Sequence, residues 1–197
     1  MIAVLTDDIW QEFEHIFEFI YNESRIQLSL KSQHEHVTGS FNFYISYAGP
    51  LGGTKDVKVD VTKGEKFFYA LEEKTIFREY SDLEEVYSLN CYSLSEIVIE
   101  KMVALMGRTT ARDLYDLWYL FYREDLDILD HIWGFKDKAI HKGHIPSTFT
   151  EKVSNKYKSL KGQWAKSLTS QIHDIPDFDD VWREIHKHLR KFNKNYE

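Results

Sequence analysis

The sequence predicts an α+β protein in which a strand-rich first half is followed by a bundle of helices. Two observations lead to this prediction. Between residues 25 and 62, apolar and polar residues alternate in three segments, which is the spacing of half-buried strands. From Ser93 onward, apolar residues recur every three or four positions, as in helices. We therefore expect a strand-rich part over residues 1–90 and a helical part over residues 91–197, packed together as one compact unit.

The composition is that of a cytoplasmic globular protein. Hydrophobic residues make up 43% of the 197, which is enough apolar material for a core. The single Cys91 cannot form an internal disulfide, which is typical of a reducing compartment. No apolar run reaches the length of a membrane span, and no secretory signal is evident. The net charge of −7 argues against broad, nonspecific binding to nucleic acid.

The strand-rich part is expected to begin with a short strand and a helix. Ile2–Leu5 is predicted as the strand, and Asp7 and Asp8 are predicted to cap a helix over Asp8–Tyr21. Gly49–Gly53 has the composition of a hairpin loop. The three alternating segments, each predicted as a strand, are Arg25–Lys31, Phe41–Tyr47 and Val57–Thr62.

The last of these strands places charged residues side by side. Its valines occupy alternate positions, so Lys58, Asp60 and Thr62 share the opposite face. Lys58 and Asp60 would thus present an amine and a carboxylate together to a ligand, and we expect them to open on the same cleft as Lys101. The alternative is that Asp60 is simply an exposed residue on an open sheet face.

Lys101 occupies an unusual position in the first predicted helix of the second half. Ser93 and Glu96 form a capping-box pattern and Gly107 is a helix stop, so Leu94–Met106 is predicted to be helical. Within it Lys101 projects into an apolar stripe, and Arg108 lies close to the same line. A buried ammonium needs an anion nearby. Two interpretations stay open: Lys101 ties two helices together through Glu96 or Asp113, or it holds a phosphate.

The remaining helices follow in order. One opens with charged residues around Arg112–Asp116 and then becomes apolar. Pro146 and Pro176 are expected in connections. The later helices are predicted over Asp125–Trp133, Thr148–Ser170 and Phe178–Phe192.

Three blocks resemble the AbiEii-type nucleotidyltransferase toxin family. They are Val57–Thr62, Tyr92–Lys101 with Arg108, and Arg112–Asp116, in the family's order. The resemblance, which covers about residues 56–121, implies a nucleotidyltransferase fold with a mixed sheet. It also implies transfer of a nucleoside monophosphate from a nucleoside triphosphate to an acceptor such as an RNA end. Mg²⁺ as cofactor and a cognate antitoxin as partner belong to the same expectation.

The resemblance also implies roles for individual residues. Asp60 would be the third metal carboxylate of the catalytic site. Lys101 would hold the triphosphate with help from Arg108 and Arg112. Lys58 would also contact the nucleotide, and Asp113 or Asp116 would order the site. For Asp113 and Asp116 the helix dipole alone favours acidic residues in a first turn. Arg112 is also well placed to pair with Asp116 at i+4.

One family motif is missing from the sequence. Members carry a Gly-Ser turn followed by Asp-x-Asp on a strand, and no Asp-x-Asp follows such a turn here. The pattern would fall before Met1, so we expect a truncated fold whose chain alone is inactive. The alternative is a noncatalytic remnant that binds an antitoxin or a second chain, or forms a homodimer through an open sheet edge.

Basic residues concentrate in the last third. They are either solvated helix faces or a footprint for RNA phosphates, with Tyr157 and Trp164 stacking on bases. The nine histidines lack spacings suited to zinc, and we expect them on the surface. The basic set comprises Lys136, Lys138, Lys142, Lys152, Lys156, Lys158, Lys161, Lys166 and the tail from Arg183 to Lys194.

Overall fold

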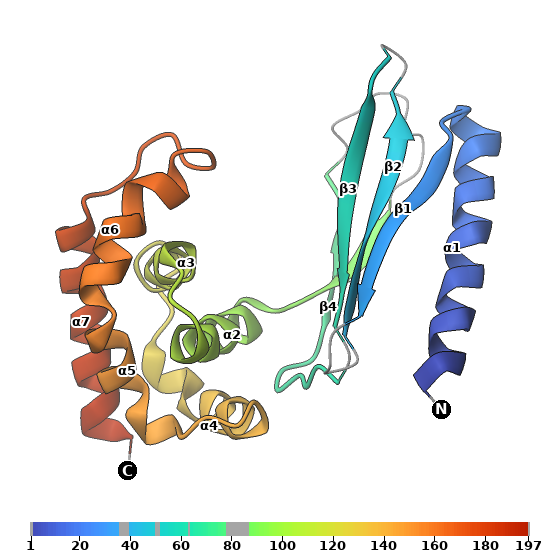
Figure 1. Ribbon diagram of the computed structural model, residues 1–197. Helices are drawn as coiled ribbons and strands as arrows, with labels where there is room; N and C mark the ends of the chain where they lie inside the picture. The colour runs from blue at the N-terminus through green and yellow to red at the C-terminus, as the bar shows by residue number, and fades with distance from the viewer. Residues whose placement is uncertain (1, 36–39, 50–51, 63, 78–86, 197) are drawn as a thin grey trace. The chain divides into compact units, whose positions relative to one another are not determined.

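The computed structural model describes residues 2–35, 40–49, 52–62, 64–77 and 87–196. It separates into two compact units, Met1–Glu65 and Lys66–Glu197, and each is described by itself (Figure 1). The α+β class and the helical C-terminal region are confirmed. No helix among the described residues is long and apolar enough to cross a membrane. Whether the strand-rich and helical parts pack as one body stays a prediction.

The first unit is a long helix with a three-stranded antiparallel sheet. The helix is α1 (Ile2–Ser24), and the strands lie in the order β1–β2–β3. Gly52 and Gly53 have positive φ angles in the turn between β2 and β3, which confirms the predicted hairpin; Pro50 and Leu51 lie outside the described residues. The strands are β1 (Leu28–Glu35), β2 (Phe41–Ala48) and β3 (Thr54–Val61).

The predicted strand at Ile2–Leu5 is wrong, because these residues are the first turns of α1. Ile2, Leu5 and Ile9 follow one another at helical spacing, and no Gly or Pro interrupts the run. The helix therefore continues back past its predicted start. Asp7 and Asp8 lie inside it and not at its cap.

The two faces of the sheet differ as predicted. Phe43 is fully buried, and its ring centroid lies 4.9 Å from that of Trp10 and 4.8 Å from that of Phe13, both on α1. On the other face Lys58 pairs in register with Tyr44, and Asp60 with Asn42. The shared face of Lys58 and Asp60 is thus confirmed.

The second unit consists of a two-stranded antiparallel sheet and a helical bundle. Both sheets of the described residues are antiparallel, in place of the mixed sheet that the resemblance implied. Both strands of the small sheet fall in this unit, N-terminal to the helices. The elements are β4 (Glu72–Thr75), β5 (Ser88–Cys91), α2 (Leu94–Gly107), α3 (Ala111–Tyr122), η1 (Ile128–His131), α4 (Ile132–His141), η2 (Pro146–Thr148), α5 (Phe149–Asn155), α6 (Tyr157–Leu168) and α7 (Phe178–Asn195).

The core of this unit surrounds α2. This helix packs against α3, α4 and α5, and α3 in turn packs against α6 and α7 (Figure 1). Val98, Ile99 and Met102 on α2 are fully buried, as is Leu114 on α3. Buried residues at helical spacing explain why α2, α3 and α7 are predictable from their periodicity.

Two predicted helices and the predicted exposure of one histidine need correction. The helix expected over Asp125–Trp133 begins only at Ile128, because the Asp127 side chain accepts a hydrogen bond from Leu129 N and caps it there. The helix expected over Thr148–Ser170 is interrupted at Lys156, between α5 and α6. His131 is buried, with Nδ1 2.7 Å from the carbonyl oxygen of Asp127, so it is not a surface histidine.

Candidate functional site

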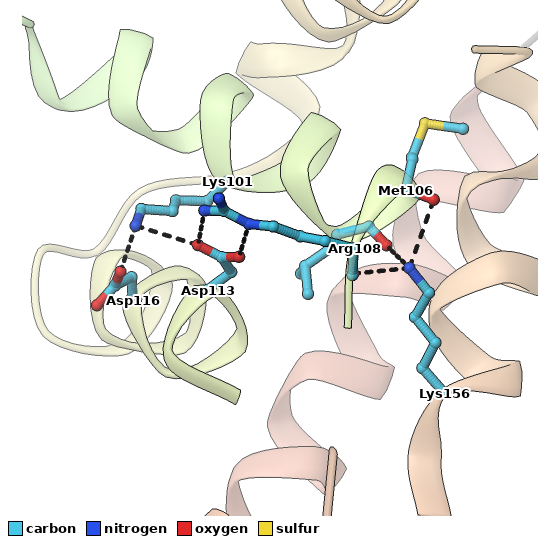
Figure 2. Close-up of polar contacts among 7 residues, drawn as sticks. Lys101, Met106, Arg108, Asp113, Asp116 and Lys156 are labelled. Atoms are coloured by element: carbon cyan, nitrogen blue, oxygen red, sulfur yellow. Dashed lines mark hydrogen bonds and ion pairs between the residues drawn. The ribbon is translucent and has the colours of Figure 1, made fainter. Parts of the chain in front are cut away.

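The turn between α2 and α3 brings the ends of the two helices together. Arg108 and Thr110 have extended backbone angles, and the Arg108 amide donates to the carbonyl of Ala104 as α2 ends. Lys101 on α2 and Asp113 on α3, twelve positions apart, therefore face each other across the turn (Figure 2). The site is built on two packed helices, so its geometry is rigid.

Asp113 is the centre of the site. Its side chain is 2% exposed, and Arg108 donates to it from Nε at 2.7 Å and from Nη2 at 2.9 Å. Lys101 Nζ lies 3.3 Å from Asp113 Oδ1 and 2.5 Å from Asp116 Oδ2 (Figure 2). The predicted carboxylates opposite Lys101 are thus Asp113 and Asp116. Arg108 holds Asp113 in the two-point geometry that guanidinium and carboxylate groups favour.

The positive charges around Asp113 oppose the effect of burial on the pKa of this residue. Burial acts to raise the pKa of Asp113, but the hydrogen bonds and charge of Arg108, with those of Lys101, lower it below its usual value. The same contact with Asp113 raises the pKa of Arg108. Asp113 is therefore ionised at neutral pH.

These residues line a polar pocket of about 300 Å³, which also includes Arg112 on the first turn of α3. Three cations and two carboxylates meet here, which leaves one positive charge in excess. Arg112 is exposed and makes no ion pair with the residues that the structure describes, so the expected pair with Asp116 is not formed. The lining residues are Lys101, Arg108, Thr110, Arg112, Asp113, Asp116 and Gln171.

Lys156 stabilises the C-terminal end of α2, next to the pocket residue Arg108. Its Nζ donates to the carbonyl oxygens of Leu105 at 2.5 Å, Met106 at 3.4 Å and Arg108 at 2.8 Å (Figure 2). These carbonyls at the end of α2 lack helical partners, and the helix dipole favours a cation there. Burial lowers the pKa of Lys156, and Lys152 adds to this effect. Sequence reasoning missed this role of Lys156 and the place of Gln171 in the pocket lining, because no local pattern connects either residue to α2.

In a second ionic cluster on α2, the lysine and one of its two carboxylates are closed to solvent. Lys138 from α4 lies 2.6 Å from Glu96 Oε1 and also pairs with Glu100. Glu96 Oε2 accepts hydrogen bonds from the backbone amides of Phe68, at 3.1 Å, and Tyr69, at 2.9 Å. The capping box is therefore half formed: Ser93 accepts from Glu96 N, but the Glu96 side chain points to other partners. The alternative that Glu96 pairs with Lys101 is not what the structure shows.

Lys58 and Asp60 belong to the other unit. Lys58 Nζ lies 2.7 Å from Asp60 Oδ1, with both side chains exposed to solvent. Donation to Asp60 raises the pKa of Lys58. The expectation that Lys58 and Asp60 open on the same cleft as Lys101 stays a prediction.

The basic last third is less available to a ligand than its composition suggests. Lys138 is buried, Lys156 binds carbonyls, and Lys161 pairs with Asp179 at 2.6 Å. Trp164 is 5% exposed and its indole nitrogen donates to the carbonyl of Pro176, so it presents no face for stacking. These three lysines and Trp164 therefore serve the fold, and an RNA footprint over the other basic residues stays a prediction.

The described residues contain no group of three His, Cys, Asp or Glu side chains that could hold a metal ion. Asp60, the expected metal carboxylate, has an ammonium as its near neighbour. A magnesium ion that is held partly by substrate phosphates needs only one or two protein carboxylates, so a role for Asp60 in holding it stays a prediction.

Comparison with known proteins gives a family match. The family model described as "Nucleotidyl transferase AbiEii toxin, Type IV TA system" matches residues 3–184. No curated protein and no solved structure matches the chain. The match covers α2, α3 and the turn between them, where the polar pocket lies, and most of both units. The chain therefore belongs to the AbiEii nucleotidyltransferase toxin family of type IV toxin–antitoxin systems.

Proposed function

We propose that the polar pocket at the α2–α3 turn binds the triphosphate of a nucleoside triphosphate. The observation that supports this best is the excess of positive charge in a pocket of about 300 Å³, where Arg112 has no carboxylate partner among the described residues. An unpaired guanidinium beside two further cations is suited to phosphate oxygens, which it can meet with two parallel hydrogen bonds.

Lys101 would then contribute as a point charge. It is 26% exposed and lies between Asp113 and Asp116, of which Asp113 is already held by Arg108. A phosphate that approaches Lys101 competes with Asp116 alone, because Asp113 keeps its partner. Asp113 would order the site by fixing Arg108, and Asp116 would set the position of the Lys101 ammonium.

We propose further that this chain alone does not transfer the nucleoside monophosphate to RNA. The reaction that family membership suggests needs metal ions at the triphosphate, and the described residues contain no group of three His, Cys, Asp or Glu side chains that could hold one. Asp60, paired with Lys58, remains the one carboxylate proposed for a metal. Nucleotide binding without a chemical step is therefore the activity that we propose for the chain alone.

A matched pair of arginines tests the binding proposal. Arg112 and Arg123 lie at opposite ends of α3, and only Arg112 lines the pocket. We expect Arg112→Gln to weaken binding of ATP or GTP about tenfold, the effect of one lost charge-assisted hydrogen bond pair. Arg123→Gln should leave binding unchanged. Isothermal titration of the three proteins measures this, and equal affinities would contradict the proposal.

The transfer proposal has its own experiment. The purified chain would be incubated with labelled nucleoside triphosphates, magnesium and total transfer RNA, and RNA-bound label counted. We expect none above background. Label that appears on RNA and disappears with Asp60→Ala would show that the chain is an active transferase and would make Asp60 essential.

Partner binding is the second candidate function, since a type IV toxin family suggests an antitoxin. Strand addition would use an edge of the three-stranded sheet, β1 or β3. β3 carries Lys55, Asp56, Lys58 and Asp60, and charges of this kind oppose pairing with a further strand. We therefore place nucleotide binding first.

A further inference from the structure

A groove lies directly beside the polar pocket. It has a volume of about 470 Å³, its lining is mainly apolar, and it runs between α2 and α3. Lys101 and Asp116 line both spaces, so their ion pair forms the boundary between them. The other lining residues are Ile97, Tyr115, Tyr119 and Leu120.

Tyr119 presents the aromatic surface of this groove. Its side chain is 41% exposed, and its ring centroid lies 6.3 Å from that of Tyr115, one turn earlier on α3. Tyr115 is half-buried and packs in turn against Trp118 and Trp164, so the ring next to Tyr119 is held in place. Opposite them, Ile97 supplies an apolar wall from α2.

We infer that this groove receives the base of the nucleoside triphosphate whose phosphates occupy the polar pocket, with Tyr119 as the stacking partner. The inference rests on the proposed function of the polar pocket. A ligand that fills both spaces must be strongly anionic at one end and flat and apolar at the other. A nucleotide has this form, and stacking of a base on an aromatic side chain is a common source of affinity. An apolar peptide side chain would use the groove but leave the cationic pocket without a role.

The two residues that line both spaces, Lys101 and Asp116, are suited to the part of a nucleotide that joins its base to its phosphates. Lys101 at the edge of the groove can meet the phosphate nearest the ribose, while Asp116 beside it can accept a hydrogen bond from a ribose hydroxyl. Stacking alone does not distinguish one base from another, because every base has a π-face. We therefore expect the groove to accept purine and pyrimidine nucleotides alike.

The experiment separates the base from the phosphates. Dissociation constants for ATP, CTP and inorganic tripolyphosphate are measured by isothermal titration for the full chain and for Tyr119→Ala, Tyr119→Phe and Tyr122→Ala. Tyr122 is the matched control, because it lies on the same helix, is 59% exposed and lines a different pocket with Trp118 and His188. Thermal melts of each variant check folding.

We expect Tyr119→Ala to weaken both nucleotides about tenfold and to leave tripolyphosphate binding unchanged. Tyr119→Phe keeps the ring and should bind like the unaltered chain, as should Tyr122→Ala. If Tyr119→Ala binds nucleotides normally while Arg112→Gln does not, the base lies elsewhere and only this inference fails. An equal loss for tripolyphosphate also overturns it. If the unaltered chain binds none of the three ligands, the proposed function fails and this inference fails with it.

Discussion

Helix α2 carries two ionic clusters that are built from the same kinds of residue and differ in exposure. In the closed cluster, Lys138 is 1% exposed and lies between Glu96 and Glu100. In the open cluster, Lys101 is 26% exposed and lies between Asp113 and Asp116. The closed cluster has one cation for two carboxylates, whereas the open one has a surplus of cations around a pocket.

The difference shows how one helix can contact a structural lysine, Lys138 of α4, and carry a proposed binding lysine, Lys101, itself. Lys138 supplies the positive charge beside the Glu96 carboxylate, and Glu96 also anchors the backbone of Phe68 and Tyr69. Lys101 shares Asp113 with Arg108, which makes the stronger, two-point contact. Removing Lys138 therefore leaves a buried charge without compensation, while removing Lys101 does not.

The largest expected effect is that of Lys138→Met. Loss of one partner from a buried ion pair typically costs about 3–5 kcal/mol, and Glu96 is fully buried. Urea unfolding followed by tryptophan fluorescence measures the free energy of unfolding, since four of the five tryptophans lie in the second unit. Adding Glu96→Gln should recover part of the loss. A cost below about 1 kcal/mol would show that the closed cluster is not structural.

Asp113→Asn should have an intermediate effect. The amide keeps the shape of the side chain but loses its charge, so the two bonds from Arg108 weaken. We expect a loss of about 2 kcal/mol, within the usual range for hydrogen bonds to a charged group. Asp116→Asn is the control, because Asp116 is 39% exposed and pairs near the surface, where such pairs contribute about 0–1 kcal/mol. Equal losses for both variants would contradict the central place of Asp113.

The pH dependence of stability sharpens the same point. Despite its burial, the pKa of Asp113 is lowered by Arg108 and Lys101, so the unfolded chain binds a proton at this residue more readily than the folded one. Its contribution is present above the ordinary value of 3.8 and is lost as the pH falls through the lower folded value. The free energy of unfolding should therefore fall less steeply with acidification in Asp113→Asn, as measured by unfolding curves between neutral and acidic pH. If the free energy of unfolding depends on acidic pH equally in both proteins, the ion pair between Asp113 and Arg108 does not contribute as we expect.

The smallest expected effect on stability is that of Lys101→Met. Arg108 still compensates Asp113, Asp116 reaches solvent, and the new side chain suits the apolar stripe. We expect the free energy of unfolding to change by less than about 1 kcal/mol, and to rise if desolvation of the ammonium is costly. Triphosphate binding should be lost. Thermal melts with and without nucleoside triphosphate test both statements, and a large drop without ligand would make Lys101 a structural tie.

Much of the site is predictable because its elements are local. The apolar stripe of α2 places Lys101 where an anion is required, and the acidic first turn of α3 offers Asp113 and Asp116 close by in sequence. The alternation in β3 likewise places Lys58 and Asp60 on one face. Errors arise where a side chain acts at long range: the composition of the last third suggests a basic surface for Lys138, yet it is buried against Glu96, 42 positions earlier.

The sequence by itself determined most of the helix and strand segments and the need of Lys101 for a nearby anion, because periodicity, caps and turns depend on neighbours within a few positions. Only the tertiary structure decided which carboxylates lie next to Lys101. Glu96 lies five positions before Lys101 on α2 but points to Lys138, and Arg108 takes the better geometry on Asp113. The break at Lys156, whose side chain reaches the end of α2, was decided in the same way. Such pairings depend on how helices pack, and that is settled by the whole core.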